Sequence, residues 1–299
     1  MSQACSISVR RPYGLARVCR VLDVARSTVY ARRERAEQAR PPGRSGPKRG
    51  IVPDAELLAA IQEVLAASPF HGEGYRKVWA RLRAKGVRVD KDRVRRFMGR
   101  AGLLAPQRAG TPHGPAAHDG TITTEKPDQM WGTDATQTVT VEQGTATIFA
   151  VVDHCTAECI GIHAALRGTR FEALEPLRQG IKEHFGSYEK NVAEGLAVRH
   201  DHGSQFLSRH YQGELAFLGI AASPAFVREP EGNGCVERFW RTLKEQLLWV
   251  RTFRTIEELR LALQEFRDLY NRAWIVQKHG FLTPSKVREK LTARQEVAA

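Results

Sequence analysis

Three acidic residues are candidates for a metal-dependent phosphoryl-transfer site, which needs several carboxylates that converge on one point. Asp134 lies in a stretch rich in Thr and Val, Asp201 follows a short apolar stretch, and Glu237 lies near the start of a helical pattern. Magnesium prefers oxygen ligands, and two ions about 3.5–4 Å apart hold the attacking and leaving oxygens of an in-line displacement. These three carboxylates are therefore candidate catalytic residues and metal ligands.

The elements that must position these acids follow from the hydrophobic pattern after residue 129. We expect strands at 131–141, 146–153, 159–165, 196–200 and 219–223, and helices at 171–185, 209–218, 234–250 and 255–269. Early strands followed by alternating helices and short strands indicate an α/β sheet flanked by helices. Asp134 then lies in the first strand, Asp201 at the end of a short strand, and Glu237 near the start of a helix.

The helix that carries Glu237 has two different faces. An apolar stripe that includes Trp240 is expected to pack on the sheet. Arg241 and Lys244 lie four and seven residues after Glu237 and share its face, so we predict that both contact the DNA backbone. The alternative is that Arg241 only pairs with Glu237.

The first third of the chain is helical and basic. Residues 14–35 have the pattern of two short helices with basic residues on the second, which is typical of a helix-turn-helix, with Ser27 as a cap of the second helix. Residues 54–104 carry further apolar stripes beside basic residues, which suits contact with phosphate groups or, alternatively, a solvated helix face. The residues predicted to bind DNA in these two segments are Arg26, Ser27, Arg32, Arg76, Lys77, Arg93 and Arg96.

Two stretches rich in Gly, Pro and polar residues divide the chain. We predict a helix-turn-helix-like segment at 1–37, a linker at 38–53, a helical DNA-binding domain at 54–105, a second linker at 106–127, a catalytic core at 128–290 and a tail at 291–299.

The charge of the chain favours a polyanionic partner. The formal net charge of the 299 residues is +13, and the excess lies before residue 120, where 24 Lys and Arg face 10 Asp and Glu. Nucleic acid is therefore the expected partner. The five scattered cysteines suit a reducing cytosol, and the sequence contains neither a membrane-length apolar run nor a signal-peptide pattern.

Several motifs resemble those of one transposase family. Residues 200–206, His-Asp-His-Gly-Ser-Gln-Phe, and 231–239, Glu-Gly-Asn-Gly-Cys-Val-Glu-Arg-Phe, resemble the stretches around the second aspartate and the glutamate of integrase-like transposases of bacterial insertion-sequence family three. The 35 residues between Asp201 and Glu237 match the family's spacing, and Tyr270-Asn271 with Thr283-Pro284 resembles its C-terminal signature. The resemblance covers nearly the whole chain and extends, more distantly, to retroviral integrases.

The resemblance implies an RNase H-like, retroviral integrase-type core with a mainly α-helical N-terminal DNA-binding region. It implies that Asp134, Asp201 and Glu237 hold two Mg²⁺ ions, for which Mn²⁺ can substitute. The expected activity is cleavage of the element ends and joining of the 3′-hydroxyls to target DNA. The expected partners are the terminal inverted repeats, target DNA and further copies of the chain, in the bacterial cytoplasm at the nucleoid; the need for an upstream-frame helix-turn-helix protein stays open.

Some residues near the predicted site are not assigned to it. The family places a non-catalytic aspartate at the position of Asp153, and His200 and His202 lack the further ligands of a zinc site. The segment 272–280 departs from the family pattern, which leaves its role open. Two rival functions also stay open: an RNase H-like nuclease without strand transfer, and a domesticated DNA-binding regulator.

Overall fold

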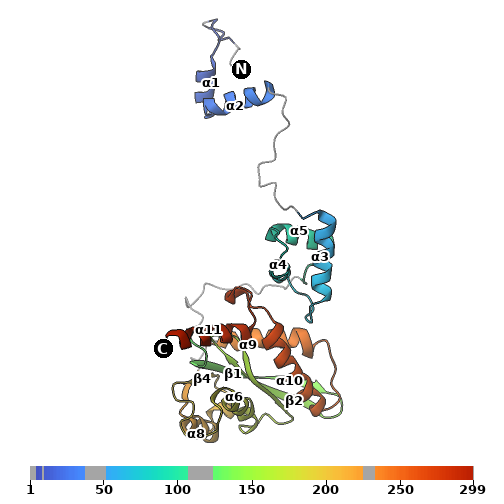
Figure 1. Cartoon of the computed structure of the whole chain (residues 1–299), viewed down its shortest axis with the longest axis vertical. Coiled ribbons are helices and arrows are strands. Elements are labelled where there is room, and N and C mark those ends of the chain that lie inside the picture. The colour runs from blue at the N-terminus through green and yellow to red at the C-terminus, as the bar shows by residue number, and fades with distance from the viewer. Residues whose placement is uncertain (1–4, 9, 38–51, 107–123, 225–232, 299) are drawn as a thin grey trace. The chain divides into compact units, whose positions relative to one another are not determined.

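The computed structural model describes residues 5–8, 10–37, 52–106, 124–224 and 233–298, and it divides into two compact units, Met1–Ile51 and Val52–Ala299 (Figure 1). Most of the two predicted linkers, and the residues 225–232 before Glu237, lie outside the described residues.

The first unit contains two short helices, α1 (Leu15–Val21) and α2 (Arg26–Glu37), as predicted. Cys19 is the one buried residue among those described in α1. Arg26, Ser27 and Arg32 are exposed. The prediction that Ser27 caps the second helix is wrong, because α2 already begins at Arg26 and Ser27 lies inside its first turn.

Three helices at the start of the second unit form a small core of their own. They are α3 (Asp54–Ala66), α4 (Tyr75–Ala84) and α5 (Lys91–Arg100). The side chain of Asp90 accepts hydrogen bonds from the amides of Asp92 and Arg93, which caps the start of α5. The predicted apolar stripes supply the buried residues: Leu57, Ile61, Val64, Val78, Leu82, Val94 and Met98.

The rest of this unit is built on one mixed sheet. Its strands are β1 (Met130–Thr140), β2 (Gly144–Asp153), β3 (Cys159–Ala165), β4 (Ala197–His200) and β5 (Ala221–Pro224). They lie in the order β3-β2-β1-β4-β5. The first three strands pair antiparallel, whereas β4 runs parallel to both β1 and β5.

Helices cover both faces of this sheet (Figure 1). They are α6 (Glu175–Phe185), preceded by η1 (Glu172–Leu174), α7 (Ser204–Leu207), α8 (Arg209–Leu218), α9 (Gly234–Leu243), α10 (Ile256–Ala273) and α11 (Pro284–Ala298), with η4 (Gln277–His279) before α11. Successive residues of a strand point to opposite faces. In β2, Ile148 and Val152 accordingly face the core under α9 and α10, whereas Phe149 and Val151 face the core under α6 and α8.

The predicted α/β core is therefore confirmed, with differences at four helix ends. The helix expected at 171–185 is η1 followed by α6, which begins at Glu175. The helix expected at 234–250 is α9 followed by a π-helical turn, η3 (Lys244–Leu248). The helix expected to end at residue 269 continues to Ala273. The segment 291–299, predicted as a tail, mostly continues α11, which runs to Ala298. No helix in the described ranges has the length and apolarity needed to cross a bilayer.

Candidate active site

The parallel pairing of β1 with β4 brings two of the predicted acids to one edge of the sheet. Met130 is paired with Ala197, and Gly132 with Arg199. Asp134 lies two residues beyond Gly132, and Asp201 two residues beyond Arg199. Because neighbouring parallel strands advance together, at about 3.3 Å per residue, these acids lie at the same level of the sheet.

Helix α9 brings the third acid to this edge. The side-chain amide of Asn233 donates to the carbonyl of Thr133 (3.1 Å), and the indole of Trp240 donates to Oδ2 of Asp134 (3.0 Å). Glu237 lies four residues after Asn233 and three before Trp240, so the helix period places it on the face directed at β1.

The close contact between α9 and β1 depends on Gly132. A Cβ at this position would lie 2.5 Å from Oδ1 of Asn233 and 2.7 Å from Cγ2 of Val236. These distances are too short for real Cβ contacts, so a side chain here would push α9 away from the strand.

The three carboxylates interact electrostatically. The pKa of Asp134 is raised, first by burial and then by the negative charges of Asp201 and Glu237, while hydrogen bonds from the Ala135 amide and from Trp240 oppose the rise. Asp201 and Glu237 are exposed. Within the described ranges none of the three makes an ion pair. Among the described residues, the site is therefore a group of like charges without a compensating cation.

The chemistry of these side chains fits a hard divalent ion, because all three offer carboxylate oxygens. Their positions are not yet those of a coordination sphere. Among the described residues, no three His, Cys, Asp or Glu side chains form a group able to hold a metal ion. The fold thus brings the acids to one edge of the sheet, and the side chains of Asp201 and Glu237 would still have to turn toward an ion.

The residues predicted to contact DNA fall into two groups. Arg76, Arg96 and Arg241 are exposed, and Lys244 is partly exposed. Lys77 and Arg93 are engaged inside the protein.

Two cations of the helical domain are thus engaged in packing, Lys77 partly against Trp274 of the core and Arg93 within the domain. The ammonium of Lys77 lies 2.8 Å from the ring centroid of Trp274 and 4.0 Å from Oε1 of the buried Glu73. The guanidinium of Arg93 donates to the carbonyl of Val52 and to Oδ1 of Asp54, both at 2.6 Å. These contacts leave each side chain less than 20% exposed, at 19% and 17%.

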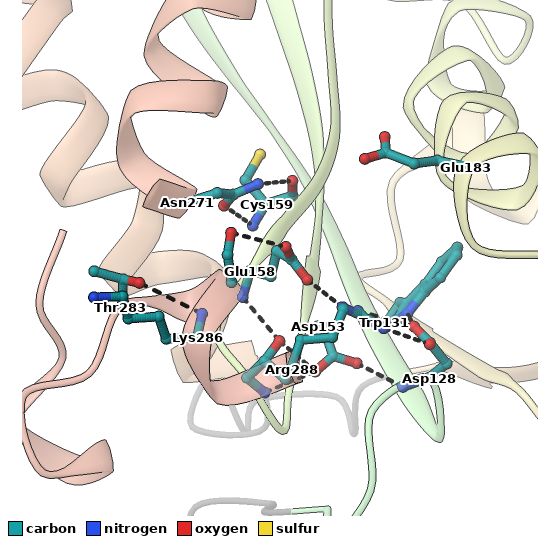
Figure 2. A network of polar contacts seen from close by, with 12 residues as sticks. Asp128, Trp131, Asp153, Glu158, Cys159, Glu183, Asn271, Thr283, Lys286 and Arg288 are labelled. Carbon is teal, nitrogen blue, oxygen red and sulfur yellow. Dashed lines mark hydrogen bonds and ion pairs between the residues drawn. The ribbon is translucent and has the colours of Figure 1, made fainter. Parts of the chain in front are cut away.

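The C-terminal signature of the family has a structural role in this chain. Asn271 holds the backbone of Cys159 from both sides, since its Oδ1 accepts from the Cys159 amide (2.9 Å) and its Nδ2 donates to the Cys159 carbonyl (3.0 Å) (Figure 2). Thr283 lies just before α11, and its hydroxyl accepts from the amide of Lys286.

At the start of β1, a network of acids is closed by one cation. Arg288 of α11 pairs with both Asp128 and Glu158, and the amide of Asp128 donates to Asp153 (Figure 2). Asp153 also accepts from the amide and the hydroxyl of Thr156. The buried Asp153 is therefore part of the framework, in agreement with its exclusion from the predicted site.

The segment that departs from the family pattern packs against the helical domain. Phe70 is buried in the core under α9 and α10 and meets Trp274 edge-on, with ring centroids 4.9 Å apart. Gln246 in η3 accepts from the amide of His71 (2.8 Å) and donates to its carbonyl (2.9 Å). The sequence analysis missed this contact, for which only the unusual Trp274 gave a signal. It also missed the polar roles of Asn233 and Trp240.

Comparisons with known proteins agree with this organisation. A family model described as integrase core domain matches residues 218–284, and one described as HTH-like domain matches residues 53–110. The Escherichia coli transposase InsD for insertion element IS2A/D/F/H/I/K is 24% identical over 247 residues, which cover 80% of this chain and 79% of InsD. InsD for IS2-9 matches equally, with 78% of its length covered.

Solved structures of viral integrases are also similar. The simian T-cell lymphotropic virus intasome in complex with PP2A regulatory subunit B56 gamma gives a TM-score of 0.47 at 18% identity, covering 70% of each chain. The BIV integrase catalytic core gives 0.41 at 18% identity, covering 56% of this chain and 99% of that one. The HTLV-2 integrase core, solved in complex with magnesium, gives 0.41 at 18% identity, covering 55% and 98%.

The chain has an integrase core preceded by an HTH-like domain. The mixed sheet and the three carboxylates that lie together beside β1 and β4 agree with this class of protein. Such proteins are polynucleotidyl transferases. More particularly, the two matched models and the InsD relatives identify the chain as a DNA transposase.

Proposed function

We propose that this transposase cleaves the ends of its insertion element and joins the freed 3′-hydroxyls to DNA by two-metal phosphoryl transfer. Asp134, Asp201 and Glu237 are the proposed catalytic residues and metal ligands. The observation that carries the proposal is the meeting of β1, β4 and α9 at one edge of the sheet, where the charges of Asp201 and Glu237 raise the pKa of Asp134. Uncompensated carboxylates at such an edge favour cation binding.

The chain's own residues hold and orient the reacting groups. Hydrogen bonds from the Ala135 amide and from Trp240 fix Asp134, and the exposed Asp201 and Glu237 would supply the other carboxylate oxygens that hold the ions. Bound Mg²⁺ or Mn²⁺ supplies activation of the nucleophile and neutralises charge at the phosphorus. No residue forms a covalent intermediate with DNA in this scheme.

The proposed DNA contacts lie in three places. In the first unit they are the exposed Arg26, Ser27 and Arg32, and in the helical domain they are Arg76 and Arg96. In the core they are Arg241 and Lys244, on the same side of α9 and η3 as Glu237. Lys77 and Arg93 are left out of this surface, because they serve the packing of the helical domain.

The site of action follows from these contacts. We propose that the protein works at the bacterial nucleoid, on terminal inverted repeats and target DNA. We further propose that two or more copies act together, because transposition must hold two element ends at once.

The test uses duplexes that carry the inverted repeats flanking the coding region, with Mg²⁺ or Mn²⁺. The intact protein should nick the repeat end and join it to a target duplex, and Asp134→Ala, Asp201→Ala and Glu237→Ala should each lose at least about 10³-fold of both activities. Glu265→Ala removes an exposed acid of α10 and serves as the matched control.

Each rival function predicts a different outcome. Nicking without any joined product would indicate a nuclease that lacks strand transfer. Sequence-specific binding without nicking would indicate a regulator. Cleavage that persists in any of the three acid variants would overturn the assignment of the site.

A further inference from the structure

The carboxylate of Asp134 is held at both oxygens. Its Oδ1 accepts from the amide of Ala135 at 2.8 Å, and its Oδ2 accepts from the indole Nε1 of Trp240 at 3.0 Å. A carboxylate oxygen has about two lone-pair sites, so each oxygen keeps one site for a cation. The two donors thereby decide in which direction the remaining lone pairs of Asp134 point.

Trp240 is itself fixed in place. Its side chain is buried in the core under α9 and α10, and its ring lies 5.7 Å from that of Phe239. A buried indole N–H needs an acceptor, and Oδ2 of Asp134 is the acceptor found for it among the described residues. Since the ring cannot turn without leaving this N–H unsatisfied, the bond to Asp134 is built into the fold.

The register of α9 on β1 is held on both sides of Glu237. Asn233 bonds the carbonyl of Thr133, one turn before Glu237, and Trp240 bonds Asp134, one turn after it. The close approach at Gly132 leaves no room for another register. Glu237 therefore lies between two anchors that both attach to the strand of Asp134.

We propose that Trp240 is a positioning residue of the acidic site, whose indole N–H orients the carboxylate of Asp134 for a divalent cation. This inference rests on the proposed function, because it assumes that Asp134 binds such an ion. Partners that orient a metal ligand from behind typically account for about 10–100-fold in metal affinity, so the effect is measurable without DNA or turnover.

The chain offers a matched control on the same strand. Trp131 is also buried, and its indole also donates to an aspartate, Oδ1 of Asp128, at 2.9 Å. Asp128, however, lies just before the start of β1 and is paired with Arg288. Trp131→Phe and Trp240→Phe therefore each remove one hydrogen bond from an indole to an aspartate. Trp131→Phe removes it from Asp128, which Arg288 compensates, and Trp240→Phe removes it from Asp134 of the acidic site.

The experiment measures Mn²⁺ affinity by water-proton relaxation on the full chain, with thermal melts for each variant. We expect Trp240→Phe to weaken Mn²⁺ binding about 10–100-fold and Trp131→Phe to leave it unchanged, although both lower the melting temperature. Equal Mn²⁺ affinity in the two variants would overturn the inference. Failure of the intact protein to bind Mn²⁺ through Asp134 would instead overturn the proposed function.

A second measurement needs no altered Trp240. In the intact ¹⁵N-labelled protein, the indole N–H resonance of Trp240 should shift when Mg²⁺ alone is added, and that of Trp131 should not. The Trp240 signal is assigned by elimination, with Phe substitutions at the other four tryptophans. A Trp240 resonance that stays in place while Mg²⁺ binds would contradict a positioning role and leave Trp240 as a core residue only.

Discussion

Two regions of strand β1, its start and its middle, differ in how buried and half-buried acids are compensated. At its start, Asp128, Asp153 and Glu158 are joined by Arg288 and by backbone and hydroxyl donors (Figure 2). Near its middle, Asp134 meets Asp201 and Glu237, and the described residues supply no cation.

This difference distinguishes acids that support the fold from acids that belong to the functional site. A buried charge is costly unless it is paired and hydrogen-bonded, so an acid that only supports the fold is expected to come with its counter-charge. The cluster at Asp134 keeps an electrostatic cost that a bound cation would remove. Such uncompensated acids are typical of functional sites.

The largest expected effect tests the compensated end. Arg288→Met removes the one cation shared by Asp128 and Glu158, which are 24% and 10% exposed. Leaving partly buried acids unpaired should cost about 3–5 kcal/mol of unfolding free energy, measured by urea denaturation.

The control for this prediction is a surface pair. Arg251→Met breaks the ion pair with Glu258, in which Arg251 is 46% exposed and Glu258 is 34% exposed; it should leave the unfolding free energy nearly unchanged, because solvent screens such a pair. If Arg288→Met lowered the unfolding free energy no more than Arg251→Met does, the distinction between the start and the middle of β1 would fail.

The next effect tests the contact that brings Glu237 to Asp134. Gly132→Ala places a Cβ against Asn233 and Val236 and should destabilise the protein by about 1–3 kcal/mol. Because α9 is displaced, cleavage of element ends should fall more steeply than stability does.

Gly213 in α8 provides the control, because a Cβ there meets nothing within 4 Å. Gly213→Ala should raise stability by up to about 1 kcal/mol through its higher helix propensity and leave cleavage intact. Full activity in Gly132→Ala would mean that the spacing of α9 and β1 is not critical.

The smallest effect tests the repulsion among the acids. Glu237→Gln removes one of the charges that raise the pKa of Asp134. In metal-free protein it should raise the melting temperature by roughly 1–2 °C near pH 7, which corresponds to about 0.5 kcal/mol.

The pH dependence of this effect has a definite sign. The folded pKa of Asp134 is raised above its ordinary 3.8. The folded protein therefore loses stability as the pH rises through that pKa, because Asp134 must ionise beside other charges. The advantage of Glu237→Gln should appear above about pH 4 and vanish below it, as melts across pH would record. An advantage of Glu237→Gln over the wild type that persists at pH 3 would contradict the repulsion.

Much of the fold and the identity of the acids could be predicted from the sequence. The hydrophobic period is a local property, so β3 and α8 were predicted to the residue and β1 and β2 closely. The three carboxylates could be identified because their spacing and their flanking residues are properties of the sequence itself. The ends of α10 and α11 were less predictable, because tertiary packing extends a helix beyond its own pattern.

What the sequence by itself determined is which groups carry charge and on which elements they lie. Only the tertiary structure decided which charges meet. It directed Lys77 to Trp274 and Glu73, and Arg93 to Asp54, away from the surface where both were expected. It also gave Trp240, predicted as an apolar residue, a bond to an aspartate 106 residues away. The physical reason is that compensation of a charge depends on distance in space, which sequence spacing does not measure.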